Sequence, residues 1–184
     1  MVLIRPFEEC DNAWMLDIEK LCPQGNEKYA WGVDKSPDAI ARYKLYDNWK
    51  VLVAEEERKI AGWIGWTVKH YTTQKEQYVY LTEVLTEVMI HPKFRRKGIA
   101  TQLVKEAEKN AREIGSSHIY CYIFGPNEAS KALFEKLDYS NMGEIKSCGL
   151  TVYKKANIAK KYTIERTSKS DIPDVVSLIQ VVMV

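Results

Sequence analysis

The sequence predicts an α/β (α+β) fold, with a mixed, mostly antiparallel central sheet flanked by helices. Strand patterns and amphipathic helix patterns alternate along the chain, which favours one sheet covered by helices over separate bundles and sandwiches. Between residues 51 and 90, segments rich in β-branched and aromatic residues are separated by short polar turns, as in an antiparallel meander. Two later strand patterns each lead directly into a helix pattern, which would bring both turns to one edge of the sheet.

The first elements are a short strand at Val2–Ile4 and a helix from about Cys10 to Leu21, whose apolar residues recur at helical spacing. Pro23 and Gly25 end that helix. An irregular segment, 24–36, and a second helix, about 37–46, are expected to follow.

The meander is predicted from Val51–Ala54 and Ile60–Val68, joined by the polar turn 55–59, and from the long strand Tyr78–Ile90. Pro92 would end this ladder, because proline lacks the N–H that a central strand needs.

The second half contains an amphipathic helix from Ile99, for which Gly115 is a suitable C-terminal cap. A buried strand at Ser117–Phe124 comes next, and Asn127 is placed to cap a second helix at its N-terminus. Two closing strands are expected at 142–146 and 149–154.

The composition is that of an ordinary globular protein: 46% of the 184 residues are hydrophobic and 28% are charged. The net charge of +2 is nearly balanced, so a nucleic-acid partner would have to rely on local clustering of basic residues. The compact basic cluster is Lys93, Arg95, Arg96 and Lys97. We therefore do not expect a nucleic-acid partner.

No apolar run approaches the roughly 20 residues that a membrane helix needs. The four cysteines lack Cys-x-x-Cys and matched histidine spacing, so no metal site is expected. A reducing, cytoplasmic location away from membranes is the simplest interpretation.

The most informative stretch runs from Glu87 to Thr101, where a strand passes into a helix through a basic turn that contains Gly98. A helix N-terminus offers backbone N–H groups without intrahelical partners and carries partial positive charge. Because glycine has no side chain, a ligand can approach that backbone closely. The turn is therefore a candidate phosphate site.

This turn, Arg95-Arg96-Lys97-Gly98-Ile99-Ala100, resembles the Gln/Arg-x-x-Gly-x-Gly/Ala motif of the GNAT superfamily of N-acetyltransferases. A second motif of that family resembles Asn127-Glu128-Ala129 and the following 132–139. The resemblance covers roughly residues 2–155. It implies a GNAT-like sheet, acetyl-CoA (CoA) as cofactor, and acetyl transfer to a primary amine of a small molecule or peptide by direct attack.

The resemblance also implies a set of cofactor-binding residues. The backbone of one strand would pair with the pantetheine arm, the basic turn would hold the pyrophosphate, and an asparagine would bond the pantetheine. These residues are Val88, Ile90, Arg95, Arg96, Lys97, Gly98, Ile99, Ala100, Thr101 and Asn127.

The general base is harder to assign, because the family's usual positions correspond to Thr86 and Val84, neither of which is a base. Glu87 and Glu83 lie one position away, and strand alternation would put them on the other face. A bulge in this strand, which the family has, would reverse that alternation locally. Glu87 is therefore the first candidate and Glu83 the second; the alternative is that both are solvent-facing strand charges.

The general acid is also displaced, since Phe134 stands where many members have a tyrosine. Tyr122, Tyr139 or water could protonate the thiolate, or it could leave without help, because its pKa is only about 8.5. Tyr122 stands where protein N-terminal acetyltransferases have a glutamate, which argues against close kinship with them. Asp138 replaces a usual glycine and leaves the local turn undecided.

Two other functions stay open from sequence: a CoA-binding module that has lost catalysis, and nucleic-acid binding through 93–97. The expected domains are an acetyltransferase domain at 1–155, a linker at 156–161 and a strand-helix segment at 162–184. That last segment repeats the chain's opening, with Ile4 matching Ile164 and Asp11 matching Asp171. It is the start of a second GNAT-like domain, a plain C-terminal helix, or a segment that packs on another chain. Separately, the sequence leaves a homodimer open.

Overall fold

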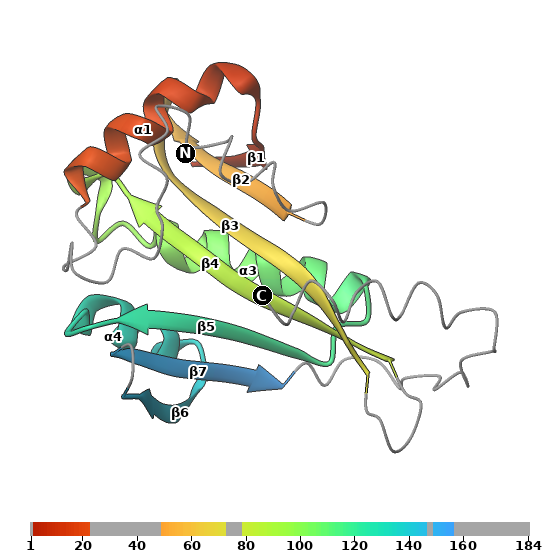
Figure 1. Ribbon diagram of the computed structural model, residues 1–184. Coiled ribbons are helices and arrows are strands. Elements are labelled where there is room, and N and C mark those ends of the chain that lie inside the picture. Colours follow the sequence, from red (N-terminus) through yellow and green to blue (C-terminus); the bar gives the residue numbers. More distant parts are fainter. Residues whose placement is uncertain (1, 23–48, 73–78, 147–148, 157–184) are drawn as a thin grey trace.

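The computed structural model of the chain describes residues 2–22, 49–72, 79–146 and 149–156. Its strands form a seven-stranded sheet in the order β1-β2-β3-β4-β5-β7-β6 (Figure 1). The elements are β1 (Leu3–Pro6), η1 (Glu9–Asp11), α1 (Asn12–Leu21), β2 (Trp49–Glu56), β3 (Lys59–Thr72), β4 (Val79–Ile90), η3 (Pro92–Phe94), α3 (Ile99–Glu113), β5 (His118–Phe124), α4 (Glu128–Lys136), β6 (Ser140–Ile145) and β7 (Leu150–Ala156).

The sheet is mixed and mostly antiparallel, which confirms the predicted fold class. Strands β1 to β4 form an antiparallel meander, β4 and β5 run parallel, and β5, β7 and β6 are again antiparallel. Since β4 and β5 are parallel, their C-terminal ends lie at the same edge of the sheet. The two strand-to-helix turns therefore meet there, as the sequence indicated.

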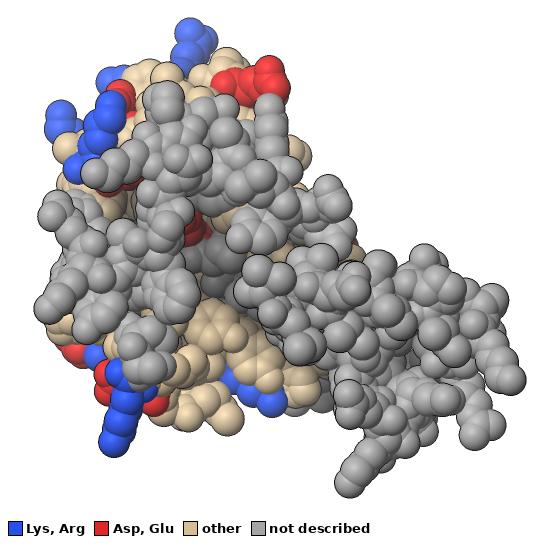
Figure 2. Space-filling model, in the orientation of Figure 1, with Lys and Arg blue, Asp and Glu red and all other residues tan. Residues whose placement is uncertain are grey.

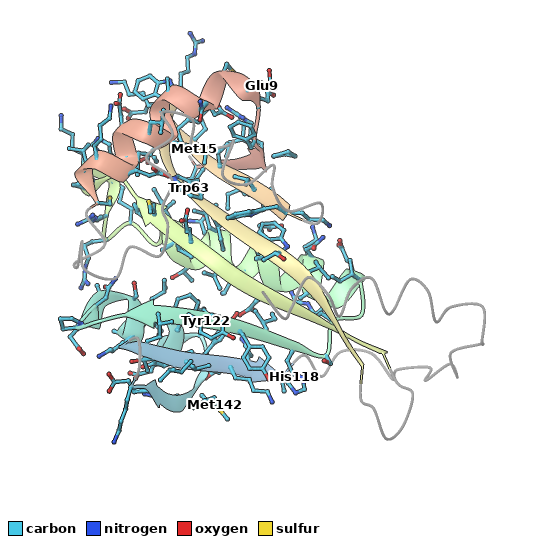
Figure 3. The ribbon with its side chains drawn as sticks, viewed as in Figure 1. Glu9, Met15, Trp63, His118, Tyr122 and Met142 are labelled. Carbon is cyan, nitrogen blue, oxygen red and sulfur yellow. The ribbon has the colours of Figure 1, made fainter. Side chains whose placement is uncertain are left out.

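Helices cover both faces of the sheet, because successive side chains of a strand point to opposite faces. On one face, α3 packs Leu103 and Val104 against Ile64 and Trp66. On the other, Met15 of α1 packs against Trp63, as Figure 3 shows. Both tryptophans, Trp63 and Trp66, are buried.

Helix α3 keeps the predicted apolar stripe and the predicted cap. Two carbonyl groups of its last turn are satisfied by a Schellman motif, in which the Ser116 N–H donates to Ala111 O at 2.8 Å and the Gly115 N–H donates to Arg112 O at 3.3 Å. Gly115 has a φ of 72°, which glycine adopts without steric cost. This helix positions the basic turn at its N-terminus.

Several expectations fall outside the described residues: the segment 24–36, the helix near 37–46, and the strand-helix segment 162–184. Strand β7 extends to Ala156, the first residue of the expected linker. Within the part of the chain that the structure describes, no helix is long and apolar enough to cross a membrane. Among those same residues, no group of His, Cys, Asp and Glu side chains could hold a metal ion.

Candidate functional site

Strands β4 and β5 pair over a short distance and then separate. The parallel ladder joins Thr82–Leu85 to His118–Cys121 and goes no further. At the same point β4 carries a bulge: Gly65 pairs with Glu87 and Trp66 pairs with Leu85, which leaves Thr86 as the extra residue. Figure 1 shows the two strands diverging toward their C-terminal ends. Beyond the bulge, the edge of β4 that faces β5 is left open.

The open edge presents backbone polar groups of Val88 and Ile90. The His91 N–H donates to Ala61 O at 2.9 Å, so these two residues form a hydrogen-bonded pair of the antiparallel ladder. Since such pairs alternate along a strand, the N–H and C=O groups of Val88 and Ile90 point away from β3 and toward β5. This is the orientation that an added extended ligand needs.

A cavity of about 1060 Å³ lies between the separated strands. In Figure 2, acidic atoms, drawn in red, are visible near the middle of the face shown. The lining comes from the ends of β4 and β5, both strand-to-helix turns, α4, the end of α1 and the β6–β7 turn. It includes Cys22, Glu87, Val88, Ile90, Arg95, Arg96, Gly98, Ile99, Ala100, Thr101, Tyr122, Asn127, Phe134 and Glu144.

The basic turn at one end of the cavity has the geometry of an anion site. Gly98 has a φ of 79°, and a Cβ added there would meet nothing within 4 Å, so its backbone is open to a ligand. The first N–H to bond within the helix is that of Gln102, which donates to Gly98 O at 3.1 Å. The N–H groups of Ile99, Ala100 and Thr101 therefore lack intrahelical partners and are the ones that can hold an anion.

The cationic side chains of this turn have different surroundings. Arg95 Nε donates to Ile90 O at 3.1 Å. Lys97 Nζ is 2.9 Å from Glu56 Oε2, and Lys97 is not among the lining residues of the cavity. Arg96 lines the cavity, is exposed, and makes no ion pair or hydrogen bond with another described residue. Of the basic residues predicted here, the structure thus directs one side chain, that of Lys97, away from the cavity.

The second turn follows β5 and is organised by Asn127. Its Oδ1 accepts from the Ser130 N–H at 3.2 Å, which confirms the predicted N-cap of α4. Helix α4 ends at Lys136 and is followed by Asp138, which has a φ of 63° in place of the family's glycine. Its N–H donates to Glu135 O at 3.0 Å and the Tyr139 N–H donates to Phe134 O at 3.0 Å, so the turn is a Schellman motif with aspartate at the left-handed position.

The bulge places Glu87 in the cavity and separates it from Glu83. Glu87 pairs with Gly65 and lies on the same face of the sheet as Trp63, which is the face covered by α1. Glu83 pairs with Val68, and the Val68 side chain packs on the face covered by α3. The indole ring of Trp49 lies directly over Gly65, because a Cβ added to this glycine would be only 2.5 Å from Trp49 Cζ2. The ring is therefore next to Glu87, which pairs with Gly65 and is half-buried. The side chain of Glu83 lies outside the described part of the chain.

Candidate acids differ in their access to the cavity. Tyr122 lines it and is 40% exposed, whereas Tyr139 is buried and is not a lining residue. Phe134 also lines it and packs edge-on against Tyr139, with ring centroids 5.0 Å apart. Cys121 lines the cavity as well, but burial raises the pKa of its thiol, which therefore stays protonated and a poor nucleophile.

Sequence reasoning did not identify Cys22, at the end of α1, or Glu144, on β6, as lining residues. No local pattern could have found them, because they reach the cavity only through tertiary packing. The thiol of Cys22 is half-buried.

The chain is similar to known proteins in sequence and in fold. The sequence model of the "Acetyltransferase (GNAT) family" matches residues 15–139, well over half of the chain. The chain is 26% identical over 92 residues to the uncharacterized N-acetyltransferase YdgE of Bacillus subtilis, an alignment that covers 50% of this chain and only 54% of that protein. It is 29% identical over 138 residues to the acetyltransferase plu1384 of Photorhabdus laumondii, covering 75% of this chain and 86% of that one.

Among solved structures, the fold is similar to that of yncA from Salmonella typhimurium, whose structure contains its cofactor acetyl-CoA. The TM-score is 0.69 at 20% sequence identity, and the superposition covers 91% of this chain and 99% of that one. At 20% sequence identity, this similarity is evidence for a shared fold only.

Proposed function

Because the chain belongs to the acetyltransferase (GNAT) family, we propose that it transfers an acetyl group from acetyl-CoA to a primary amine by direct attack. The observation that carries the proposal is the cavity itself. It brings together the open edge at Val88, the helix N-terminus at Gly98 and the carboxylate of Glu87.

The residues present fit acetyl-CoA, which supplies an activated thioester when bound. An extended pantetheine arm can pair with the backbone groups that Val88 and Ile90 turn toward β5. The pyrophosphate suits the N–H groups of Ile99 to Thr101. Asn127 lines the cavity from the other side, although its Oδ1 already accepts from Ser130, which leaves its amide NH₂ to donate to the arm.

Glu87 is proposed as the general base. A primary amine is mostly protonated at neutral pH, with a pKa near 10, so it must lose a proton before it attacks. A half-buried carboxylate inside the cavity can take that proton directly or through one water. Glu83 remains the second candidate.

The charge that develops on the thioester oxygen needs a donor aimed at it. The N–H of Val88 points into the space between β4 and β5 and is the proposed donor. The proton for the departing sulfur is proposed to come from Tyr122, the tyrosine that lines the cavity, or from water. Direct attack is favoured over an acyl-enzyme route because Cys121 is held in its thiol form by burial.

A second candidate function is a CoA-binding module without catalysis. It is favoured by Phe134, a buried ring that cannot donate a proton where many relatives of this family have a tyrosine. Nucleic-acid binding through 93–97 loses support, because two of the four cations, Arg95 and Lys97, already contact protein groups.

The test is a thermal-shift titration with acetyl-CoA followed by a panel of small amines and peptides, with release of free thiol as the readout. A raised Tm together with thiol release that depends on one class of amine supports acetyl transfer. A raised Tm without release for any amine supports the inactive module. A Tm that acetyl-CoA leaves unchanged contradicts both.

A further inference from the structure

The lining of the cavity has two walls, one on each face of the sheet, because successive side chains of a strand alternate between the faces. On β4, Val88 packs with the core on the face covered by α3, and Glu87, the residue before it, lies on the face covered by α1. On β5, Ile123 packs on the α3 face, so Tyr122 lies on the α1 face. The lining residues on the α1 face form the α1-side wall, which consists of Leu21, Cys22, Glu87, Met89 and Tyr122.

The charged residues of the lining are distributed unequally between these faces. Arg96 belongs to the turn that begins α3, and Lys136 is on α4, which packs on the same face as α3. Glu144 of β6 shares the face of Ile123, which is again the α3 face. Among the described residues, Glu87 is therefore the charged member of the α1-side wall. A ligand group that lies against this wall meets a negative charge.

Arg95 is the lining cation that reaches the α1-side wall, and its donors are partly used there. Its Nε donates to Ile90 O at 3.1 Å and its Nη2 donates to Cys22 Sγ at 3.1 Å. These bonds occupy two of the donors with which a guanidinium holds a carboxylate bidentately. An anionic group placed beside Glu87 would have to compete with protein acceptors for Arg95 while it lies next to a like charge.

The α1-side wall also offers apolar surface to a ligand. Leu21 is 50% exposed and Tyr122 is 40% exposed, although both line the cavity. Large apolar side chains that face solvent at a cavity mark a place where an apolar part of a ligand can be buried. The indole ring of Trp49 lies next to Glu87, and an aromatic ring beside a carboxylate favours an ammonium group.

We propose that the acceptor is a primary amine that carries an apolar or aromatic group and no carboxylate, as 2-phenylethylamine does, rather than a free amino acid. The acceptor enters from the α1 face, its amine lies at Glu87, and its apolar group packs on Leu21 and Tyr122. Leu21 is the specificity-determining residue, because it supplies apolar surface and takes no part in the chemistry. The inference rests on the proposed acetyl transfer and names the class of amine that receives the acetyl group.

The first test compares kcat/KM, measured as thiol release from acetyl-CoA, for four amines: 2-phenylethylamine, phenylalanine, phenylalaninamide and ethanolamine. Phenylalaninamide keeps the size of the amino acid without its negative charge, and ethanolamine lacks the apolar group. We expect phenylalanine to be about 100-fold worse than 2-phenylethylamine or more, since it brings a carboxylate beside that of Glu87. Phenylalaninamide should stay within about tenfold of 2-phenylethylamine, and ethanolamine should be about tenfold worse through a higher KM.

The second test changes Leu21 to alanine and to lysine. Leu21→Ala should raise KM for 2-phenylethylamine about fivefold and leave ethanolamine unchanged, because only apolar contact is lost. Leu21→Lys should improve phenylalanine relative to 2-phenylethylamine by about tenfold, since the new cation offsets the carboxylate. Trp14→Ala and Trp14→Lys are the matched controls, because Trp14 is 46% exposed on the same helix and does not line the cavity. The Tm and the acetyl-CoA affinity of each variant show that it is folded.

Calorimetric titration of the same four amines into the chain saturated with CoA gives a readout that needs no turnover. If no amine is acetylated but 2-phenylethylamine binds and phenylalanine does not, the class of ligand stands and the proposed acetyl transfer falls. If phenylalanine reacts or binds as well as 2-phenylethylamine, the inference is overturned and acetyl transfer stands. The inference is also overturned if Leu21→Lys behaves like Trp14→Lys, or if none of the four amines binds or reacts.

Discussion

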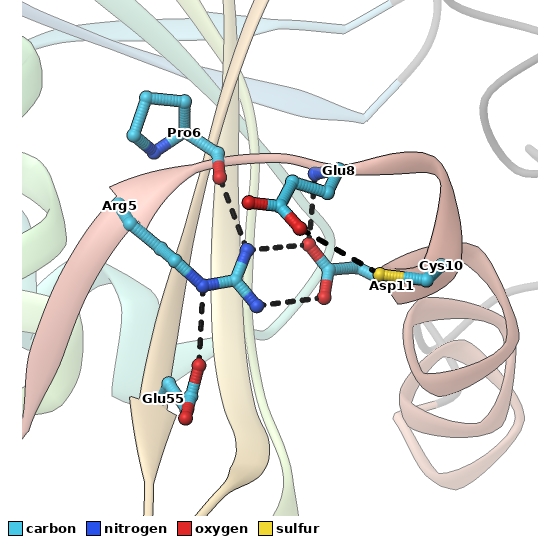
Figure 4. A network of polar contacts seen from close by, with 6 residues as sticks. All are labelled: Arg5, Pro6, Glu8, Cys10, Asp11 and Glu55. Carbon is cyan, nitrogen blue, oxygen red and sulfur yellow. Dashed lines mark hydrogen bonds and ion pairs between the residues drawn. The ribbon is translucent and has the colours of Figure 1, made fainter.

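The guanidinium of Arg5 holds both carboxylate oxygens of Asp11, at 2.7 and 2.9 Å (Figure 4). Arg5 lies on β1 and also bonds Glu55 of β2 at 3.1 Å, whereas Asp11 ends η1 just before α1 and accepts from the Glu8 N–H at 2.9 Å. The pair therefore joins the first strand, its neighbour and the start of the first helix. Since the Asp11 side chain is only 4% exposed, its charge depends on this partner.

Replacing Arg5 by alanine should lower the free energy of unfolding by about 3 kcal/mol, because it leaves a buried carboxylate without its cation. The measurement is urea unfolding, read as a lower midpoint at an unchanged slope. Lys20→Ala is the matched control: its pair with Asp17 is 3.0 Å long but 73% and 64% exposed, and should be worth less than about 1 kcal/mol. Equal losses for the two variants would contradict a structural role for Arg5.

The same pair predicts a dependence of stability on pH. Burial alone would raise the pKa of Asp11, but the hydrogen bonds from Arg5 and from the Glu8 N–H outweigh it and hold that pKa below its ordinary value. Asp11 binds a proton less readily in the folded chain than in the unfolded one, so its contribution is complete above the unfolded pKa of about 4. The contribution of Asp11 to stability is lost as the pH falls through the lower pKa that this side chain has in the folded chain.

We therefore expect the stability difference between the unmodified chain and Asp11→Asn to be constant from neutral pH down to about pH 5 and to shrink below about pH 4. Urea unfolding of both proteins at a series of pH values measures it. A difference that stays the same, or that grows in acid, would refute this assignment.

Asp138 predicts a stabilising substitution. It holds the left-handed position of a Schellman motif, where a side chain costs about 1–2 kcal/mol, and glycine would recover part of this while adding freedom to the unfolded chain. Asp138→Gly should raise the free energy of unfolding by about 0.5–1 kcal/mol.

The matched control is Gly115→Ala, in the equivalent position after α3, where φ is 72°. It should destabilise by about 1 kcal/mol for the same reason. Both changes are read from urea midpoints. The interpretation fails if Asp138→Gly is no more stable than the unmodified chain while Gly115→Ala is less stable.

The fold followed from patterns that are local in sequence. The β-branched meander up to Ile90, the apolar stripe that begins at Ile99 and the caps at Gly115 and Asn127 each depend on a few neighbouring residues, and each is present. The predicted strand ends at Ile90 and Phe124 are exact, and the other strand ends shifted by one to four residues, because the ends of elements depend on pairing and packing rather than on propensity.

Only part of the candidate site could be predicted from the sequence. Motif positions located the turn at Gly98 and the second turn at Asn127, and the family's bulge explained how Glu87 reaches the cavity. The sequence could not predict which cationic side chains face the cavity, because this depends on contacts between distant segments, such as that of Lys97 with Glu56 of β2. The approach of Cys22 to Arg95 is another contact of this kind.

Tyr122 is the candidate acid that a conservative change can test. Tyr122→Phe keeps the ring and removes only the hydroxyl, so acetyl-CoA binding should be unchanged. If the phenol protonates the leaving thiolate, kcat should fall by about 10- to 100-fold, at the lower end of general acid catalysis because a thiolate leaves readily. The matched control is Tyr120→Phe, which removes a hydroxyl on the same strand but outside the cavity lining. Equal rates for the two variants would assign the proton to water.

Glu87→Gln gives the most direct test of the chemistry, because glutamine has nearly the same shape and cannot accept a proton. Its side chain lines the cavity on the face that the bulge at Thr86 turns it toward. We expect kcat to fall by about 10²- to 10⁴-fold, as for the loss of a general base, while calorimetry shows unchanged acetyl-CoA affinity.

The loss should be smallest at high pH, where more of the amine is already neutral and needs no base. Glu106→Gln, on the outer side of α3, is the control and should keep full activity, since its carboxylate is 44% exposed and not part of the cavity. If Glu87→Gln keeps its rate and Glu83→Gln loses it, the base is Glu83. If neither variant loses activity across the pH range, the proton leaves through water and no carboxylate of this strand takes part.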